Sequence, residues 1–318
     1  MNREIKNAVM TTDIEAQYDE NAKRLLGNKY ILAHILVASV DEFKGMNPKD
    51  VVSYIEGEPM MGIVPVEPGM TNAVREEKGQ RVVGFNTENV EAHEGLVRFD
   101  IVFYVRMRDG ISQIIVNIEM QKDNPAKYKI LNRAVFYVSR LISSQKERDF
   151  EKTNYDDIKR VFSIWICMGM DEDSLDYVHL TNDRLLGDHV WEGKMDLLNI
   201  VLIGMSKELS AQEGHHELHR LLGALLSAKL PVEEKLDILE MEYEIPMEEE
   251  EKEEVRVMCN LGEGIREKAE ARGKAIGEAK VILGMYRKGY SLEQIADVAE
   301  KNVEEVRGIV EKRDTVLA

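Results

Sequence analysis

An Asp-Gly dipeptide between two apolar runs is the feature that most restricts the fold of this chain. Asp109 and Gly110 follow a strand-like run from Arg98 to Tyr104 and precede another from Ile114 to Gln121. Asp-Gly in this setting is a strong signal for a β-hairpin, because both residues tolerate the left-handed backbone of a tight turn. The sequence therefore predicts an antiparallel strand pair.

The register of this hairpin sets two carboxylates against each other. With a two-residue turn, Arg108 pairs with Ile111, and Asp100 then lies directly opposite Glu119. Their Cβ atoms would be about 4.5–5.5 Å apart, and like charges at that distance destabilise a sheet unless a cation neutralises them. Strand alternation puts Gln121 on the same face as Glu119. The alternative is an accidental carboxylate pair on a solvated face, or a longer turn that separates the two side chains.

The charge of the chain limits how it could bind nucleic acid. The formal net charge of −17 over 318 residues argues against a surface that binds phosphate throughout. One segment differs, because seven basic residues and only two acidic ones lie between Lys122 and Arg148. A local basic surface directly after Gln121 is therefore predicted.

Cysteine content and hydropathy favour a cytoplasmic protein. Only two cysteines occur, Cys167 and Cys259, and their spacing indicates neither a disulfide framework nor a zinc ribbon. Residues 1–13 lack the pattern of a signal peptide, and no apolar run approaches the roughly 20 residues of a membrane-spanning helix. We expect a cytoplasmic location and no contact with a membrane.

The order of the expected elements predicts an α/β sandwich with a mixed sheet. Residues 57–80 are expected to be loop or irregular edge structure, and no strand pattern recurs beyond Ser206. The other expected elements are a helix at 22–43, a helix at 48–56, the hairpin, a helix at 126–145, and strands at 161–167, 177–180 and 197–203.

The helix expected at 126–145 carries two stripes of side chains. The stripe that we expect to pack against the sheet contains Leu131, Val135, Val138 and Ile142. The other stripe contains Arg133, Tyr137, Arg140 and Ser144.

Taken in order, Asp100, the hairpin, Glu119-Met120-Gln121 and the basic helix resemble the core of the PD-(D/E)XK nuclease superfamily. More narrowly, they resemble the PD-(D/E)XK nuclease family transposases of bacteria and the related recombination-promoting nucleases. In these proteins E-x-K is written E-x-Q, and an Arg and a Tyr on the next helix match Arg133 and Tyr137. The resemblance covers roughly residues 23–207. It implies a restriction-endonuclease-like mixed sheet flanked by helices, with a helical C-terminal extension.

The resemblance also implies a metal site and a reaction. Asp100, Glu119 and the backbone carbonyl of Met120 would bind Mg²⁺, with Mn²⁺ as an alternative, because hard cations take oxygen ligands. Gln121 stands where the superfamily has Lys, and it can orient the attacking water but cannot accept its proton. The implied activity is hydrolysis of DNA phosphodiester bonds.

The resemblance leaves the roles of other residues open. A Lys from the helix, Lys127 or Lys129, could replace the missing one, or each could only contact phosphate or solvent. Arg133 could contact phosphate or form a helix-to-sheet hydrogen bond, and a further acidic ligand could be Glu42 or Glu56. The expected DNA-binding residues are Lys127, Lys129, Arg133, Tyr137 and Arg140.

The expected domains are a polar lead-in at 1–22, a nuclease-like domain at 23–209, a helical segment with an acidic run at 210–254, and a helical region at 255–318. We expect a transposase- or recombination-associated endodeoxyribonuclease whose partner is DNA. The alternative is a nuclease-fold protein that no longer cleaves and acts as a DNA-binding or protein-interaction module, which the acidity and the missing Lys favour. The region at 255–318 is a candidate for homo-oligomer formation.

Overall fold

The computed structural model describes residues 16–61, 65–66, 73–75, 81–83, 88–91, 95–98, 100–110, 113–121, 128–146, 148–206, 217–227 and 229–311. These residues fall into two compact units. One extends over Asp19–Met258, and the other contains residues 259–311 together with 16–18. Each unit is described by itself.

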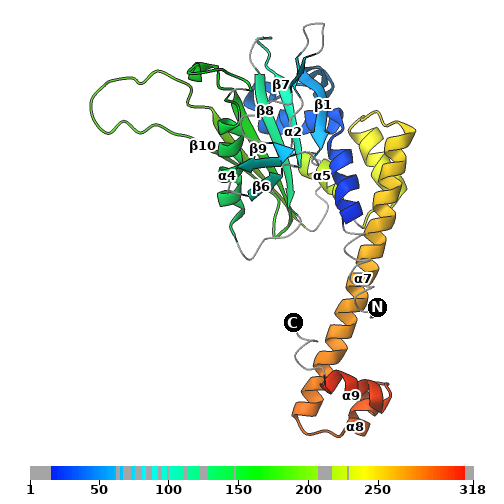
Figure 1. Cartoon of the computed structure of the whole chain (residues 1–318). Coiled ribbons are helices and arrows are strands. Elements are labelled where there is room, and N and C mark those ends of the chain that lie inside the picture. Colours follow the sequence, from blue (N-terminus) through cyan, green and yellow to red (C-terminus); the bar gives the residue numbers. More distant parts are fainter. Residues whose placement is uncertain are drawn as a thin grey trace. The chain divides into compact units, whose positions relative to one another are not determined.

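The larger unit is built on a mixed six-stranded sheet with the strand order β1-β7-β8-β9-β11-β10 (Figure 1). The central strands β8, β9 and β11 run parallel, whereas β1, β7 and β10 pair antiparallel with their neighbours. The α/β fold with a mixed sheet that the sequence predicted is confirmed. The strands are β1 (Ile55–Met61), β7 (Ile101–Arg106), β8 (Gln113–Gln121), β9 (Arg160–Met170), β10 (Ser174–His179) and β11 (Leu198–Ser206).

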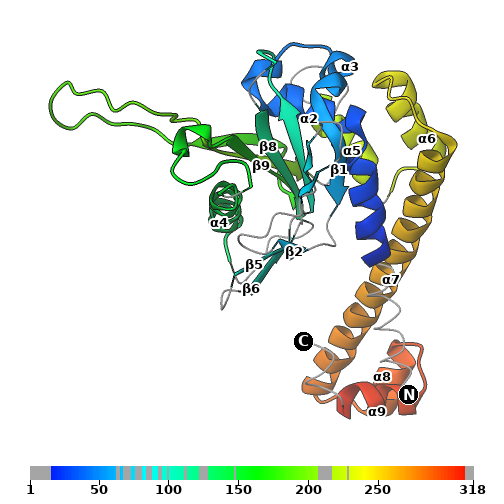
Figure 2. The same cartoon turned by 45° about the horizontal axis from the view of Figure 1, so that its top comes forward.

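Helices cover both faces of this sheet. Helix α4 (Ile130–Ser143) packs on one face, and α2 (Lys29–Ser39) and α5 (Glu217–Leu226) lie on the other (Figure 2). Strands buried on both faces read as near-continuous apolar runs, which is why β8, β9 and β11 were recognisable in the sequence. Between α4 and the next strand lies a short 3-10 helix, η3 (Tyr155–Asp157).

The edge strand β1 contains residues 57–61, which we expected to be loop or irregular edge structure, and its irregular pairing matches the second of these. Ile55 and Glu56 also belong to β1, so the helix expected at 48–56 ends earlier than predicted. The pairing of β1 with β7 shifts register between Glu56 and Met60, and Gly57 there has a φ of 63°. An edge strand tolerates Pro59 because the outer N–H groups need no partner strand, and a bulge absorbs the irregular backbone.

Five shorter described strands come between β1 and β7 in the sequence. They form a three-stranded sheet in the order β2-β5-β6 and a two-stranded sheet of β3 and β4. Their bounds are β2 (Pro65–Val66), β3 (Ala73–Arg75), β4 (Arg81–Val83), β5 (Glu88–Glu91) and β6 (Gly95–Arg98).

The helix expected at 22–43 is interrupted. Residues 16–26 are helical, and α2 begins at Lys29 because the side chain of Asn28 caps it by accepting hydrogen bonds from the N–H groups of Tyr30 and Ile31. The short helices that follow are η1 (Asp41–Phe43), α3 (Pro48–Val51) and η2 (Val52–Tyr54). Asn47 caps α3 by accepting a hydrogen bond from the N–H of Lys49.

Helix α4 faces the sheet with a side that only partly matches the predicted one, since Val138 and Ile142 pack there as predicted. Leu131 and Val135 are 40% and 42% exposed. Tyr137 packs against Trp165 of β9, with ring centroids 5.4 Å apart, and this contact turns the Tyr137 side toward the sheet. The buried residues of α4 are Ala134, Tyr137, Val138, Arg140 and Leu141.

The C-terminal part of the described chain is helical, as predicted. Helix α7 (Glu249–Arg287) is shared by the two units. Ser291 and Gln294 form a capping box at the start of α8 (Leu292–Val298), which packs with α9 (Val303–Glu311) around buried Ile282, Ile295 and Val306. The larger unit also contains α6 (Val232–Asp237) and η4 (Ile238–Glu242).

None of the described helices is long and apolar enough to cross a membrane.

Candidate functional site

The hairpin of β7 and β8 has the predicted register. Ile101 pairs with Ile118 and Arg106 pairs with Gln113, as a two-residue turn requires. The turn itself differs, because the N–H of Gly110 donates to the carbonyl of Met107 at 2.9 Å, so Arg108 and Asp109 take the central positions. Gly110 follows them with a φ of 72°, a conformation that glycine adopts without strain.

Asp100 and Glu119 lie side by side where this strand pair ends. The N–H of Asp100 donates to Glu119 Oε1 at 3.2 Å, and the N–H of Met120 donates to Asp100 Oδ2 at 2.9 Å. Each carboxylate is thus held by the backbone of the opposite strand. The predicted proximity of the two side chains is confirmed.

Glu119 is the more deeply buried of the two carboxylates. It is 3% exposed. Burial, and then the negative charge of Asp100, raise the pKa of Glu119 from 4.5 to about 8, although hydrogen bonds from Asn117 and from the backbone of Asp100 act in the opposite direction. A buried carboxylate beside a second one is stable as an anion only with a positive charge nearby.

A chain of buried hydrogen bonds orients Glu119 from beneath. Asn117 Nδ2 donates to Glu119 Oε1 at 2.9 Å, Ser163 Oγ donates to Asn117 Oδ1 at 3.0 Å, and Trp165 Nε1 donates to Ser163 Oγ at 2.9 Å. The register of β8 on β9 pairs Asn117 with Ser163 and Glu119 with Trp165. Sequence reasoning missed this chain. Its signal was a polar residue inside each of two apolar runs, because buried polar groups require partners.

The structure adds a cation that sequence reasoning also missed. Lys23, on the helix at 16–26, places Nζ 2.7 Å from Asp100 Oδ1 and 3.4 Å from Asp19. Burial acts to lower the pKa of Lys23, but the ion pairs with Asp100 and Asp19 outweigh it and raise the pKa. The only hint in the sequence is that Lys23 stands between the core positions Ala22 and Leu25.

Gln121 of β8 and Arg133 of α4 are in contact, which is the helix-to-sheet hydrogen bond that the sequence offered as one of two roles for Arg133. Arg133 Nη1 donates to Gln121 Oε1 at 3.2 Å and to the hydroxyl of Tyr128 at 3.0 Å, and Nη2 donates to the hydroxyl of Tyr137 at 2.7 Å. The guanidinium also lies over the rings of Tyr128, Tyr137 and Trp165. Arg133 therefore has a defined orientation beside the carboxylates.

The remaining basic residues that we expected at a DNA surface differ from one another. Lys129, at the start of α4, is exposed, whereas Lys127 lies outside the described residues. Arg140 is only 6% exposed, and burial lowers its pKa. A guanidinium with so little surface does not suit a phosphate contact, so the structure does not favour the expected role of Arg140.

Glu42 and Glu56 both lie at the hairpin-turn end of the sheet, far from Asp100. Glu42 accepts a hydrogen bond from the N–H of Arg108, and Glu56 accepts one from Arg106 Nε at 2.8 Å. Neither is placed to act as the additional acidic ligand that the sequence left open.

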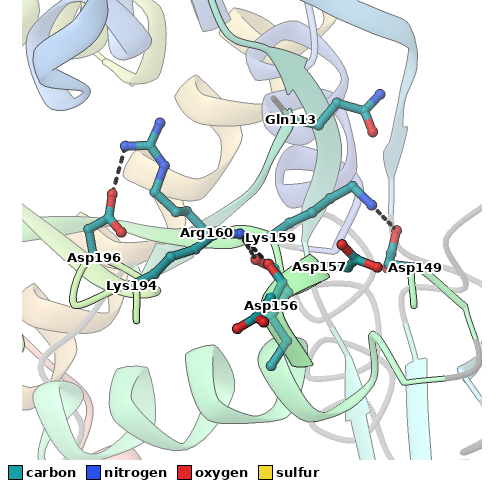
Figure 3. Close-up of a pocket in the computed structure, with 9 residues that line it drawn as sticks. Gln113, Asp149, Asp156, Asp157, Lys159, Arg160, Lys194 and Asp196 are labelled. Atoms are coloured by element: carbon teal, nitrogen blue, oxygen red, sulfur yellow. Dashed lines mark hydrogen bonds and ion pairs between the residues drawn. The ribbon is translucent and has the colours of Figure 1, made fainter. Parts of the chain in front are cut away.

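A cavity of about 590 Å³ opens at that same end of the sheet (Figure 3). It is lined by both signs of charge, and its cations are already paired. Lys159 binds Asp149 at 2.9 Å, Arg160 binds Asp196 at 3.0 Å, and Lys194 donates to the carbonyl of Asp156 at 2.6 Å. Gln113 on this wall and Glu119 are separated along β8 by roughly 20 Å, at about 3.3 Å per residue. The cavity is separate from the carboxylate pair.

The residues around Asp100 fit a hard ion that takes oxygen ligands, such as Mg²⁺ or Mn²⁺, better than an ion that prefers His or Cys ligands, such as Zn²⁺. Within the described part of the chain, no group of three or more His, Cys, Asp or Glu side chains could hold a metal ion. Mg²⁺ is commonly bound by one or two carboxylates and retains several waters, so a site with two carboxylates fits it. Burial and the charge of Asp100 raise the pKa of Glu119, and a cation bound between the two carboxylates would favour its ionised form.

Comparison with known proteins supports the family resemblance. Residues 80–221 match the family model for PD-(D/E)XK nuclease family transposases. No curated protein and no solved structure matches the chain. The predicted resemblance is confirmed over this segment, and the mixed six-stranded sheet flanked by helices is consistent with the PD-(D/E)XK nuclease fold. The match points to a nuclease- or transposase-related function and includes Asp100, Glu119 and Gln121, whereas Lys23 precedes it.

Proposed function

We propose that this protein is a metal-dependent DNA endonuclease that hydrolyses phosphodiester bonds, acts in transposition or recombination, and has residues 23–209 as its nuclease domain. The observation that carries the proposal is the pair of Asp100 and Glu119, each carboxylate fixed by a backbone N–H from across the hairpin. Two adjacent buried acids destabilise a fold unless cations neutralise them; Lys23 contacts Asp100, and a bound metal ion would neutralise Glu119 as well.

Asp100, Glu119 and the carbonyl of Met120 would hold Mg²⁺ or Mn²⁺. The N–H and C=O of one strand residue point to the same side of the strand. Since the N–H of Met120 donates to Asp100, its carbonyl is directed toward Asp100 as well. When bound, the metal lowers the pKa of a coordinated water and stabilises negative charge on the phosphate.

Gln121 and Arg133 would act on the substrate side of the site. Arg133 holds Gln121 Oε1 at 3.2 Å, which fixes the amide so that it can orient a water without accepting its proton. Arg133 and Lys129 would contact DNA phosphates, because Arg133 is fixed close to the carboxylates and Lys129 is exposed at the N-cap of α4. Tyr137 supports this group by accepting a hydrogen bond from Arg133.

A plasmid cleavage assay tests the proposal. Wild-type protein with Mg²⁺ or Mn²⁺ should nick or linearise supercoiled DNA, and a chelator should abolish the activity. Asp100→Asn and Glu119→Gln keep the size of each side chain but remove its charge, and both should be inactive while folded. Glu56→Gln is the matched control, because it removes a carboxylate at the opposite end of the sheet. Cleavage by folded Asp100→Asn and Glu119→Gln at the wild-type rate would reject the site.

A second candidate is a DNA-binding or protein-interaction module that no longer cleaves. Gln121 in place of a Lys favours it, since the described site contains no basic side chain at that position. Binding to DNA that weakens steeply with salt, without cleavage under any metal, would identify this second function.

We further propose a cytoplasmic location and homo-oligomer formation through residues 255–318. Size-exclusion chromatography of the full chain and of a chain truncated after Met247 tests the oligomer. A truncated chain with the same oligomeric state as the full chain would exclude this region as the interface.

A further inference from the structure

Among the residues that the structure describes, Lys23 is a cation in direct contact with Asp100, and it comes from an element distant in sequence. Its Nζ lies 2.7 Å from Asp100 Oδ1, and the side chains of Lys23 and Asp100 are 27% and 17% exposed. Partial burial strengthens this ion pair relative to one in bulk water. The contact joins the helix at 16–26 to the end of the β7–β8 hairpin.

The two oxygens of Asp100 have different partners. Oδ2 accepts the hydrogen bond from the N–H of Met120 at 2.9 Å, which belongs to the hairpin itself. Oδ1 contacts Lys23. Oδ1 is thus the oxygen that takes no part in the hairpin, and a divalent cation that binds Asp100 through it meets the ammonium of Lys23.

Two positive charges at one carboxylate oxygen repel each other. Arg133, a second described cation near the pair, is held by Gln121, Tyr128 and Tyr137. Lys23 also has a second acidic neighbour, Asp19, at 3.4 Å. An ammonium released from Asp100 would remain neutralised by Asp19, so the exchange does not leave Lys23 without a counterion.

We propose that Lys23 is an internal competitor for the metal: it neutralises Asp100 through Oδ1 in the metal-free protein, moves to Asp19 when a divalent cation binds, and thereby sets the metal concentration at which the site fills. This inference rests on the proposed metal site. It makes Lys23 a positioning residue and assigns it no proton transfer.

The test is metal affinity, measured as the Mn²⁺ dissociation constant by calorimetry without DNA, at the same pH for wild type and all variants. Lys23→Met removes the competitor and should bind Mn²⁺ about tenfold more tightly, the equivalent of about 1.4 kcal/mol. Lys23→Arg retains a cation and should stay close to wild type. Arg24→Met is the matched control, because it removes one positive charge from the same helix, where Arg24 pairs with Glu20 at 2.8 Å.

The direction in which Lys23→Met changes the Mn²⁺ affinity distinguishes a competitor from a residue with a purely structural role. If Lys23 only tethers the helix, Lys23→Met should loosen the site, and Mn²⁺ binding should weaken or stay unchanged; either result overturns the inference. Equal tightening in Arg24→Met would also overturn it, since the effect would then come from net charge. If neither wild type nor any variant binds Mn²⁺, the metal site of the proposed function is rejected, and this inference is rejected with it. If wild type binds Mn²⁺ tightly and Lys23→Met binds it with the same affinity, only the inference is rejected.

Discussion

Asn117 Nδ2 donates a hydrogen bond of 2.9 Å to Glu119 Oε1, and this contact connects the deepest part of the sheet to the carboxylate pair. Both side chains are on the α4 face of β8 and are buried. Because Asn117 is itself held by Ser163 and Trp165, the orientation of Glu119 depends on residues that cannot reach a substrate.

Asn117→Leu should weaken metal binding by about 10- to 100-fold, as is typical when a residue that orients a metal ligand is lost. Leu is close in size but cannot donate to Glu119, and loss of the bond raises the pKa of Glu119 further. The measurement is Mn²⁺ affinity as a function of pH, where the midpoint should move to higher pH. Asn199→Leu is the control, because Asn199 is also buried but bonds to the carbonyls of Val161 and Asp196. An unchanged midpoint in Asn117→Leu would show that Asn117 does not orient Glu119.

Glu119 should make the stability of the metal-free protein depend on pH. Its pKa is 4.5 as an ordinary glutamate and about 8 in the fold, where burial and Asp100 raise it. Between these values the folded state holds a proton that the unfolded chain releases, so the free energy of unfolding falls as pH rises, by up to about 1.4 kcal/mol per pH unit. Urea unfolding in chelator across this window measures the effect. Glu119→Gln should have a flatter profile, and parallel profiles for the two proteins would contradict the raised pKa.

Lys129 and Arg133 should each contribute to the salt dependence of DNA binding. Loss of one phosphate contact lowers the slope of log affinity against log salt by about 0.9 on duplex DNA. We expect this change for Lys129→Ala and Arg133→Gln, measured in a Glu119→Gln background that does not cleave. Arg140→Gln, at a buried position, should leave the slope unchanged. If the slope changes for Arg140→Gln and not for Lys129→Ala, the DNA does not bind at the surface formed by Lys129 and Arg133.

Asp149 should matter for stability and not for cleavage. Its carboxylate accepts a hydrogen bond of 2.6 Å from the hydroxyl of Tyr104 and pairs with Arg148 and Lys159 at the cavity end of the sheet. Asp149→Asn leaves two cations with reduced compensation and should cost about 3–5 kcal/mol of the free energy of unfolding. Chemical denaturation measures this cost, with exposed Asp188→Asn as the control. If the folded variant loses cleavage, the two ends of the sheet are coupled.

Local sequence patterns predicted the hairpin and its contacts well. The alternation of side chains along a strand has a period of two, and the Asp-Gly dipeptide marks where the chain reverses, so the approach of Asp100 to Glu119 followed from short-range rules although Arg108 and Asp109 take the centre of the turn. The same rules were less successful for α4, where Leu131 and Val135 looked like core residues. A helix can present several apolar faces, and the packing of Tyr137 on Trp165 selected among them.

The sequence by itself determined the α/β order of elements, the strand register of the hairpin and the carboxylate pair, because each of these depends on residues close together in the chain. Only the tertiary structure decided which residues surround that pair. Lys23 reaches Asp100 from the first described helix, and Asn117 reaches Ser163 because β8 and β9 lie parallel after a crossover through α4. These contacts depend on how distant segments pack around one buried core, which no local periodicity encodes.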